Sequence, residues 1–167
     1  MIIIIGLVAT GLGITFKKNY TLPETNKDTH TFFTTTLIDH NGNKVQLNQY
    51  RQSWLLVNFW ATWCAPCRKE IPELNEFFHK NKNLNINLIG IAIDEIEPVN
   101  KFTHKVPIDY TSLISNIAGI NLAKSLGNKR GVLPFTVLID PDENIKKVFY
   151  GKVKINALNQ TVNTLIQ

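Results

Sequence analysis

Apolar residues gather in blocks along the chain, and the spacing within each block predicts its secondary structure. The block at 54–61 is almost wholly apolar, which is typical of a strand covered on both faces of a sheet. A second such strand is expected at 87–93. Between them, apolar positions recur every three or four residues from 65 to 82, which predicts a helix that packs by one face. Pro72 lies inside this helix and is expected to kink it.

Shorter patterns predict the other elements. An Asn-Gly turn at 39–43 favours a hairpin between strands at 32–38 and 44–47. Further elements are expected as a helical turn at 48–50, helices at 98–105 and 121–126 with an irregular stretch between them, strands at 135–140 and 145–150 around a turn at 141–144, and a closing amphipathic helix at 155–166. This order predicts an α/β fold with a mixed central sheet and helices on both faces.

The first part of the chain lacks this alternation. Residues 1–16 carry no charged side chain, and they are slightly fewer than the roughly 20 residues that span a bilayer. We interpret residues 1–18 as a hydrophobic anchor or signal segment and favour an uncleaved anchor, with a buried element of the fold as the alternative. The polar residues 19–31 are expected to form a tether, followed by one folded domain at 32–167.

The charge balance excludes one class of partner. The chain has 18 Lys and Arg residues against 13 Asp and Glu residues, a formal net charge of +5. The basic residues are scattered and form no stripe interleaved with aromatic residues, so a nucleic-acid partner is not expected.

The two cysteines of the chain stand where the apolar strand at 54–61 gives way to the helix, as Cys64-Ala65-Pro66-Cys67. A cysteine at the start of a helix lies near unpaired N–H groups and the positive end of the helix dipole, which favour the reactive thiolate. Residues three apart on a helix are neighbours, so this pair can cycle between dithiol and disulfide. We expect Cys64, at the exposed end, to react with the partner and Cys67 to resolve the mixed disulfide.

Other uses of the cysteine pair have less support. A structural zinc site needs four ligands, and the histidines His30, His40, His79 and His104 lie far apart in the sequence. A permanent disulfide closing so short a loop would gain little chain entropy, and Arg68 after Cys67 excludes the haem-attachment motif. A redox-gated binding module or Cu(I) metallochaperone using the same dithiol stays open as the rival from a different class. We expect no metal site and no cofactor.

The segment 58–74, Asn-Phe-Trp-Ala-Thr-Trp-Cys-Ala-Pro-Cys-Arg-Lys-Glu-Ile-Pro-Glu-Leu, resembles the active-site segment of the TlpA/ResA/CcmG(DsbE)-like branch of the thioredoxin superfamily. The segment 133–140 resembles that family's second signature, a cis-proline that opens a strand, and the region 98–130 matches its helical insertion. The resemblance implies a thioredoxin-like fold over residues 32–167, with an N-terminal β-hairpin and the insertion before the cis-proline strand. It also implies thiol–disulfide exchange in the periplasm or elsewhere outside the cytoplasm.

The resemblance further implies substrates and partners. Family members often keep apocytochrome c thiols reduced in cytochrome c maturation, so we expect a protein-disulfide reductase that acts on protein thiols and disulfides. Since the chain has no further cysteine, electrons are expected from a separate membrane protein. We expect a monomer held at the inner membrane by the N-terminal segment. Oxidase or isomerase action stays open, because the Ala65-Pro66 dipeptide alone does not set the potential.

The motif also assigns roles to residues around the pair. Pro134 would be cis and face the cysteines, leaving the Leu133 backbone free to pair with an extended substrate segment, unless it is an ordinary trans proline. Trp63 is expected to lie beside Cys64 as an apolar contact for substrates, with Ala65 and Pro66 in the same contact surface.

Two polar residues bear on the proton chemistry. Glu70 lies one turn beyond Cys67, where a partly buried carboxylate could accept the Cys67 proton, although an exposed helix position is the alternative. Asn58 stands where thioredoxins proper commonly carry a buried aspartate. An amide cannot exchange protons, so we interpret Asn58 as a hydrogen-bonded core residue and expect the base to be Glu70 or water.

Overall fold

The structure, a computed structural model, describes residues 28–166, so the expected anchor and most of the expected tether lie outside the described residues. Its centre is a seven-stranded sheet with the strand order β2-β1-β5-β4-β3-β6-β7. The strands are β1 (Thr36–Asp39), β2 (Lys44–Gln46), β3 (Trp54–Trp60), β4 (Ile86–Ala92), β5 (Thr111–Ile114), β6 (Phe135–Ile139) and β7 (Ile145–Tyr150). The helices are α1 (Thr29–Phe33), the 3-10 helix η1 (Leu47–Tyr50), α2 (Ala65–Lys80), α3 (Ile96–Thr103), α4 (Ala118–Ser125) and α5 (Ile155–Ile166).

Strand β3 lies near the middle of the sheet. It pairs in parallel with β4 and antiparallel with β6, and β4 pairs in parallel with β5. The hairpin β1–β2 continues the sheet beyond β5, and β7 continues it beyond β6, all antiparallel. The mixed sheet expected from the sequence is therefore confirmed, together with its N-terminal hairpin.

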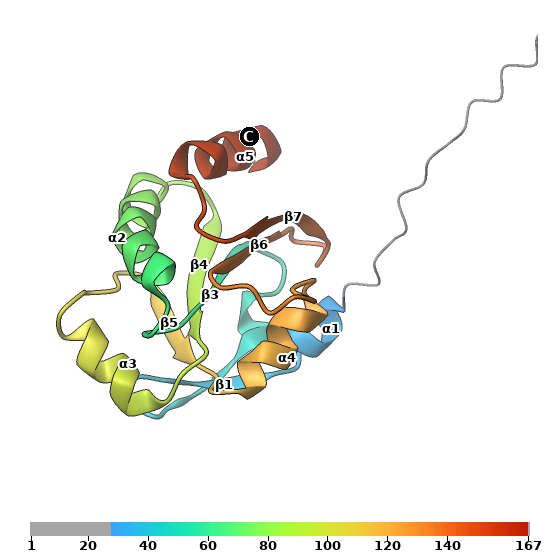
Figure 1. The fold of residues 1–167 in the computed structure, drawn as a ribbon. Coiled ribbons are helices and arrows are strands. Elements are labelled where there is room, and N and C mark those ends of the chain that lie inside the picture. Colours follow the sequence, from blue (N-terminus) through green and yellow to red (C-terminus); the bar gives the residue numbers. More distant parts are fainter. Residues whose placement is uncertain (1–27, 167) are drawn as a thin grey trace, which may run out of the picture.

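Helices cover both faces of the sheet (Figure 1). On one face, α1 and α4 pack on alternate strand residues, among them Val57, Ile89 and Val137. On the opposite face, α2 and α5 cover Leu56, Leu88 and Leu138. Helix α3 adds Val99 to a third cluster, which includes Trp60 and both cysteines. The cysteine pair thus lies on the face of the sheet that α2 covers.

The prediction of a strand from Phe32 to Ile38 was wrong in its first half. Residues 29–33 form helix α1, and the strand begins only at Thr36. The Asp28 side chain caps this helix by accepting a hydrogen bond from the Thr31 N–H, and Phe32 and Phe33 are buried. Packing of these two rings on the sheet outweighs the strand propensity of the segment.

Two further predictions needed correction. The stretch between 105 and 121 is not irregular throughout, because it contains β5, which pairs in parallel with β4. Helices α3 and α4 begin two and three residues earlier than expected, at Ile96 and Ala118. Helix α2 continues through Pro72 from Ala65 to Lys80 as one element. None of the helices within residues 28–166 is both long and apolar enough to cross a membrane.

Candidate active site

The loop between β3 and α2 is held by side chains from both sides. The Thr62 backbone N–H donates to Oδ2 of Asp94, the residue two positions after β4, at 3.1 Å. Arg68 on α2 donates from Nη1 to the Thr62 carbonyl at 2.8 Å. Because strands β3 and β4 are parallel, their carboxyl ends meet at one edge of the sheet, and these bonds fix the loop there. The structure thus gives Arg68 a positioning contact with the loop before the cysteines.

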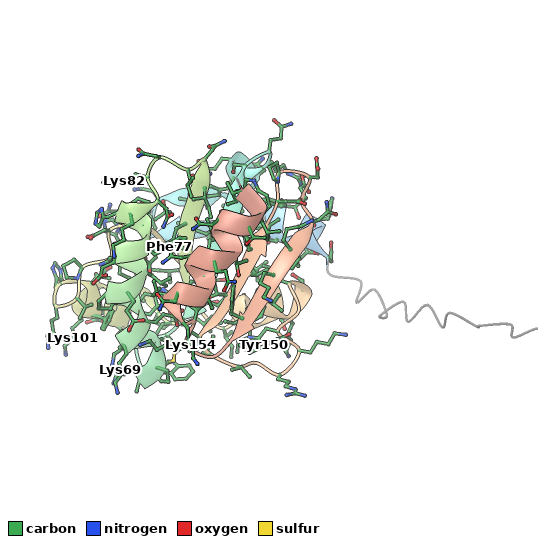
Figure 2. The ribbon with its side chains drawn as sticks, turned by 90° about the horizontal axis from the view of Figure 1, so that it is seen from above. Lys69, Phe77, Lys82, Lys101, Tyr150 and Lys154 are labelled. Atoms are coloured by element: carbon green, nitrogen blue, oxygen red, sulfur yellow. A yellow bond between two sulfur atoms is a disulfide. The ribbon has the colours of Figure 1, made fainter. Side chains whose placement is uncertain are left out.

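Cys64 and Cys67 form a disulfide at the start of α2. Cys64 is the N-cap residue, and its Sγ accepts a hydrogen bond from the Cys67 backbone N–H at 3.3 Å. The Lys69 end of α2 in Figure 2 is the end that carries the pair. On reduction, this N–H and the helix dipole would favour a thiolate on Cys64. Both cysteines are buried in this disulfide form, so Cys64 is less exposed than the sequence suggested.

The surroundings of the pair divide into a buried and an exposed part. Trp63 is 67% exposed, and Ala65 and Pro66 are exposed as well. Trp60 is fully buried and packs against Phe102, with ring centroids 5.4 Å apart. Exposed side chains therefore lie beside the buried disulfide.

The loop before β6 lies next to the pair. Leu133 packs against the apolar cluster that contains Cys64 and Cys67, and the Leu133–Pro134 peptide bond is cis, which confirms that expectation. Pro134 is buried and directly precedes β6, whose central residues pair with β3. The two segments singled out from the sequence, at 58–74 and 133–140, thus meet at one site.

Glu70 is buried, with 1% of its surface exposed, so the exposed alternative is excluded. Its Oε1 accepts a long hydrogen bond of 3.4 Å from the Val153 N–H, while Oε2 has no partner within the protein. Burial raises the pKa of Glu70 to about 8, with a further rise from Glu73 and opposing effects from the Val153 N–H and Lys152. This carboxyl group lies one helical turn beyond Cys67 and changes its charge close to neutral pH.

Asn58 is a hydrogen-bonded core residue, as interpreted from the sequence. Its Nδ2 donates to Oγ1 of Thr136 on β6 at 2.9 Å and lies 3.5 Å from Oε1 of Glu70. Because an amide takes up no proton, Glu70 is the partner in the Asn58–Glu70 contact that can titrate.

Sequence reasoning missed the loop 151–154 between β7 and α5. Lys152 forms an ion pair with Glu73 of α2, which fastens this loop to the helix and brings the Val153 N–H to Glu70. These residues belong to no motif, so only the fold could reveal them. Thr136 gave a weak signal, as a polar residue within the apolar strand at 135–140.

A helix-capping disulfide at the carboxyl end of a central strand, next to a cis-proline loop, defines a thiol–disulfide oxidoreductase of thioredoxin-like fold. Within residues 28–166, groups of three or more His, Cys, Asp or Glu residues that could hold a metal ion do not occur.

The chain belongs to the AhpC/TSA family, whose profile matches residues 27–148. A thiol-disulfide oxidoreductase ResA from Bacillus thuringiensis subsp. konkukian is 28% identical over 90% of this chain and 86% of its own length. A ResA from a strain of Bacillus cereus is 31% identical over 68% of this chain and 64% of its own length.

Solved structures show the same fold. A thioredoxin-related protein from Neisseria meningitidis serogroup B aligns with a TM-score of 0.69 and 30% identity, covering 77% of this chain and 96% of that one. A secreted disulfide oxidoreductase of Mycobacterium tuberculosis, described as homologous to the DsbE of E. coli, aligns with a TM-score of 0.67 and 19% identity over 80% of this chain and 97% of its own. At that identity the second likeness shows the fold alone. The family match and the ResA relatives agree with the thiol–disulfide oxidoreductase that the site defines.

Proposed function

We propose that this chain reduces protein disulfides outside the cytoplasm, as a monomer held at the inner membrane by residues 1–18 and supplied with electrons by a separate membrane protein. The observation that carries the reductive direction is the buried carboxyl group of Glu70, one turn from Cys67. A strongly oxidising pair stabilises its reduced form. Burial keeps the Glu70 carboxyl group largely protonated at neutral pH, and the same apolar surroundings disfavour a thiolate on Cys67, so the reduced form gains little stability.

The reaction runs through two exchanges. The Cys64 thiolate attacks one sulfur of the substrate disulfide, forming a mixed disulfide and releasing the other substrate sulfur as a thiolate. Cys67 then gives its proton to the Glu70 carboxylate, and the Cys67 thiolate attacks Sγ of Cys64. The mixed disulfide breaks, the second substrate thiolate leaves, and the pair is left as the Cys64–Cys67 disulfide. Two electrons have passed to the substrate, whose thiolates take up protons from solvent.

The substrate side of the site suits an extended polypeptide. We assign Trp63, Ala65 and Pro66 to the contact surface, because they are exposed beside the buried disulfide. The Leu133 backbone precedes Pro134 at the start of β6 and would pair with the substrate strand. A polypeptide with two cysteines close in sequence and no folded structure, such as apocytochrome c, fits this surface as substrate.

Trapping of the mixed disulfide tests this function. We would mix reduced full-length Cys67→Ser with an oxidised Cys-x-x-Cys-His peptide and detect adducts by mass spectrometry. The variant is expected to accumulate one adduct through Cys64, because its resolving sulfur is missing, whereas Cys64→Ser and the unaltered protein should accumulate none. Cu(I) titration of the reduced protein is the companion measurement. No adduct together with tight Cu(I) binding would contradict exchange and favour the metallochaperone.

A further inference from the structure

The loop between α4 and β6 is anchored at its start to two other elements. The Asn128 N–H donates to the Ala123 carbonyl of α4 at 2.9 Å. The Tyr150 hydroxyl, on β7, donates to the Gly127 carbonyl at 2.9 Å. Gly127 and Gly131 have φ values of 111° and 64°, in the region that favours glycine, and allow the loop to turn tightly. The chain therefore follows a fixed path from α4 toward the disulfide.

The side chain of Asn128 occupies both backbone groups of one residue in this loop. Its Nδ2 donates to the Val132 carbonyl at 2.8 Å, and its Oδ1 accepts a hydrogen bond from the Val132 N–H at 3.0 Å. Only 1% of the surface of Asn128 is exposed, so water does not compete for these bonds. The amide thus bonds Val132 as a partner strand would, and it does so two residues before Pro134.

Leu133 lies between backbone groups that are already occupied. Both groups of Val132 are bonded to Asn128, and the Pro134 carbonyl accepts a hydrogen bond from the Gly151 N–H at 2.9 Å. Among residues 28–166, none bonds to the N–H or the carbonyl group of Leu133. The Leu133 side chain packs against the cluster that contains both cysteines. Leu133 therefore has two free backbone groups beside the disulfide, as pairing with an extended segment requires.

The bond from Asn128 to the Val132 carbonyl also sets the direction of the Leu133 N–H. These two groups belong to one peptide unit, which is planar and trans, so they point in opposite directions. Because the Val132 carbonyl is turned toward the buried amide of Asn128, the Leu133 N–H points away from that amide. A rotation of this peptide unit would break the bond to Nδ2, so Asn128 holds the Leu133 N–H in one orientation.

We propose that Asn128 is a positioning residue for the substrate, because its side chain fixes the Val132–Leu133 peptide unit so that an extended substrate segment pairs with Leu133 in a single register. The proposal rests on the proposed function, in which the Leu133 backbone pairs with the polypeptide that carries the reacting disulfide. Pairing in one register places the substrate sulfur at a defined position relative to Cys64. Asn128 acts through Leu133, so exchange with a disulfide too small to pair does not depend on it.

Kinetics of full-length Asn128→Ala separate positioning from chemistry. For a peptide disulfide, we expect KM to rise about fivefold, the size of one lost hydrogen bond, while the rate with oxidised glutathione and the reduction potential stay unchanged. Asn144→Ala is the matched control, because the Asn144 amide bonds Asp140 in the turn at the opposite end of β6, at 3.3 Å. Its KM should equal that of the unaltered protein. An unchanged KM in Asn128→Ala, or an equal rise in both variants, would overturn the proposal.

A register scan tests the same proposal in the unaltered protein, whether or not the variant folds. Each peptide disulfide of the series carries one backbone N-methyl group, which removes one N–H near the reacting cysteine. We expect KM to rise about fivefold at one position, the N–H that pairs with the Leu133 carbonyl, and Asn128→Ala to flatten this profile. A flat profile of the unaltered protein with normal exchange overturns this inference alone. If no peptide is reduced, the proposed function fails and this inference fails with it.

Discussion

Nδ2 of Asn58 lies 3.5 Å from Oε1 of Glu70, while the same amide donates to Thr136 at 2.9 Å. An amide has two N–H groups, so Asn58 can hold Thr136 and face the carboxyl group at once. In the proposed mechanism, Glu70 is the group that takes the proton, because its neighbour Asn58 on β3 cannot ionise. This contact joins the helix that carries Cys67 to the central strand of the sheet.

Replacement of Glu70 by Gln is expected to slow the resolving step. With the pKa of Glu70 raised to about 8, the carboxylate becomes available as a base as the pH rises through that value. The resolution rate of the unaltered protein should therefore rise between about pH 7 and pH 9. Glu70→Gln should lose this rise and be slower by about 100-fold at pH 8, the low end of general-base effects. Stopped-flow measurement of peptide release from the mixed disulfide gives both values.

Glu76→Gln is the control for that variant. Glu76 lies on the same helix, but its side chain is 71% exposed and pairs only with Lys80. We expect the pH profile of this variant to match that of the unaltered protein. A Glu70→Gln profile that keeps its rise near pH 8 would show that another group takes the proton.

The stability of the oxidised protein should fall as the pH rises from about 5 to 8. The pKa of Glu70 is about 8 in the folded state against 4.5 in the absence of burial, so the unfolded chain releases this proton first. The stabilising contribution of Glu70 to the free energy of unfolding is fully present below pH 4.5 and is lost as the pH rises through 8. Its upper bound is on the order of 5 kcal/mol. Asp28 and Asp39, whose pKa values are lowered by hydrogen bonds from Thr31 and Asn43, titrate below this window.

Urea unfolding at several pH values between 5 and 8 measures this slope. Glu70→Gln carries no titrating group at this position, so its free energy of unfolding should stay nearly level over the same range. Equal slopes for the two proteins would mean that Glu70 ionises in the folded state near its ordinary pKa.

Trp63→Ala should weaken substrate binding without harming the fold. Trp63 is 67% exposed, so the free energy of unfolding is expected to change by less than about 0.5 kcal/mol. Loss of an aromatic contact at an interface typically reduces the free energy of binding by more than about 1 kcal/mol. We therefore expect the KM for a peptide disulfide to rise at least about fivefold. With a small disulfide such as oxidised glutathione, the rate should change little. Leu165→Ala on α5 is the control, and equal losses with both substrates would place Trp63 in the chemistry instead.

The candidate site could be predicted from the sequence more completely than helix α1 and strand β5. The run at 54–61, the Cys64–Cys67 spacing and the Leu133-Pro134 pair could be placed because each follows from local pattern or motif. Strand β5 could not be predicted, since its four residues form a strand only through pairing with β4 and β1. Helix α1 was missed for a similar reason, because the burial of Phe32 against the sheet decides its conformation.

The burial of Glu70 had a signal in the sequence. The buried positions of α2 include Cys67, Ile71, Leu74 and Phe77, and Glu70 falls on the same face by the helical period. A glutamate on the apolar face of a helix is therefore informative by itself. The alignment of Thr136, Asn58, Gly90 and Ser112 across the sheet had no such signal, because it depends on the register of four strands that are distant in the sequence.

The reduction potential of the Cys64–Cys67 pair tests the central claim most directly. Full-length protein would be equilibrated with thioredoxin or glutathione, and the oxidised fraction read by mass spectrometry after thiol alkylation. We predict a potential near or below that of thioredoxin, about −270 mV, because the apolar surroundings of Cys67 disfavour a thiolate on its sulfur. A value near −120 mV, typical of a strong protein oxidant, would contradict the reductive function and make the chain a disulfide donor.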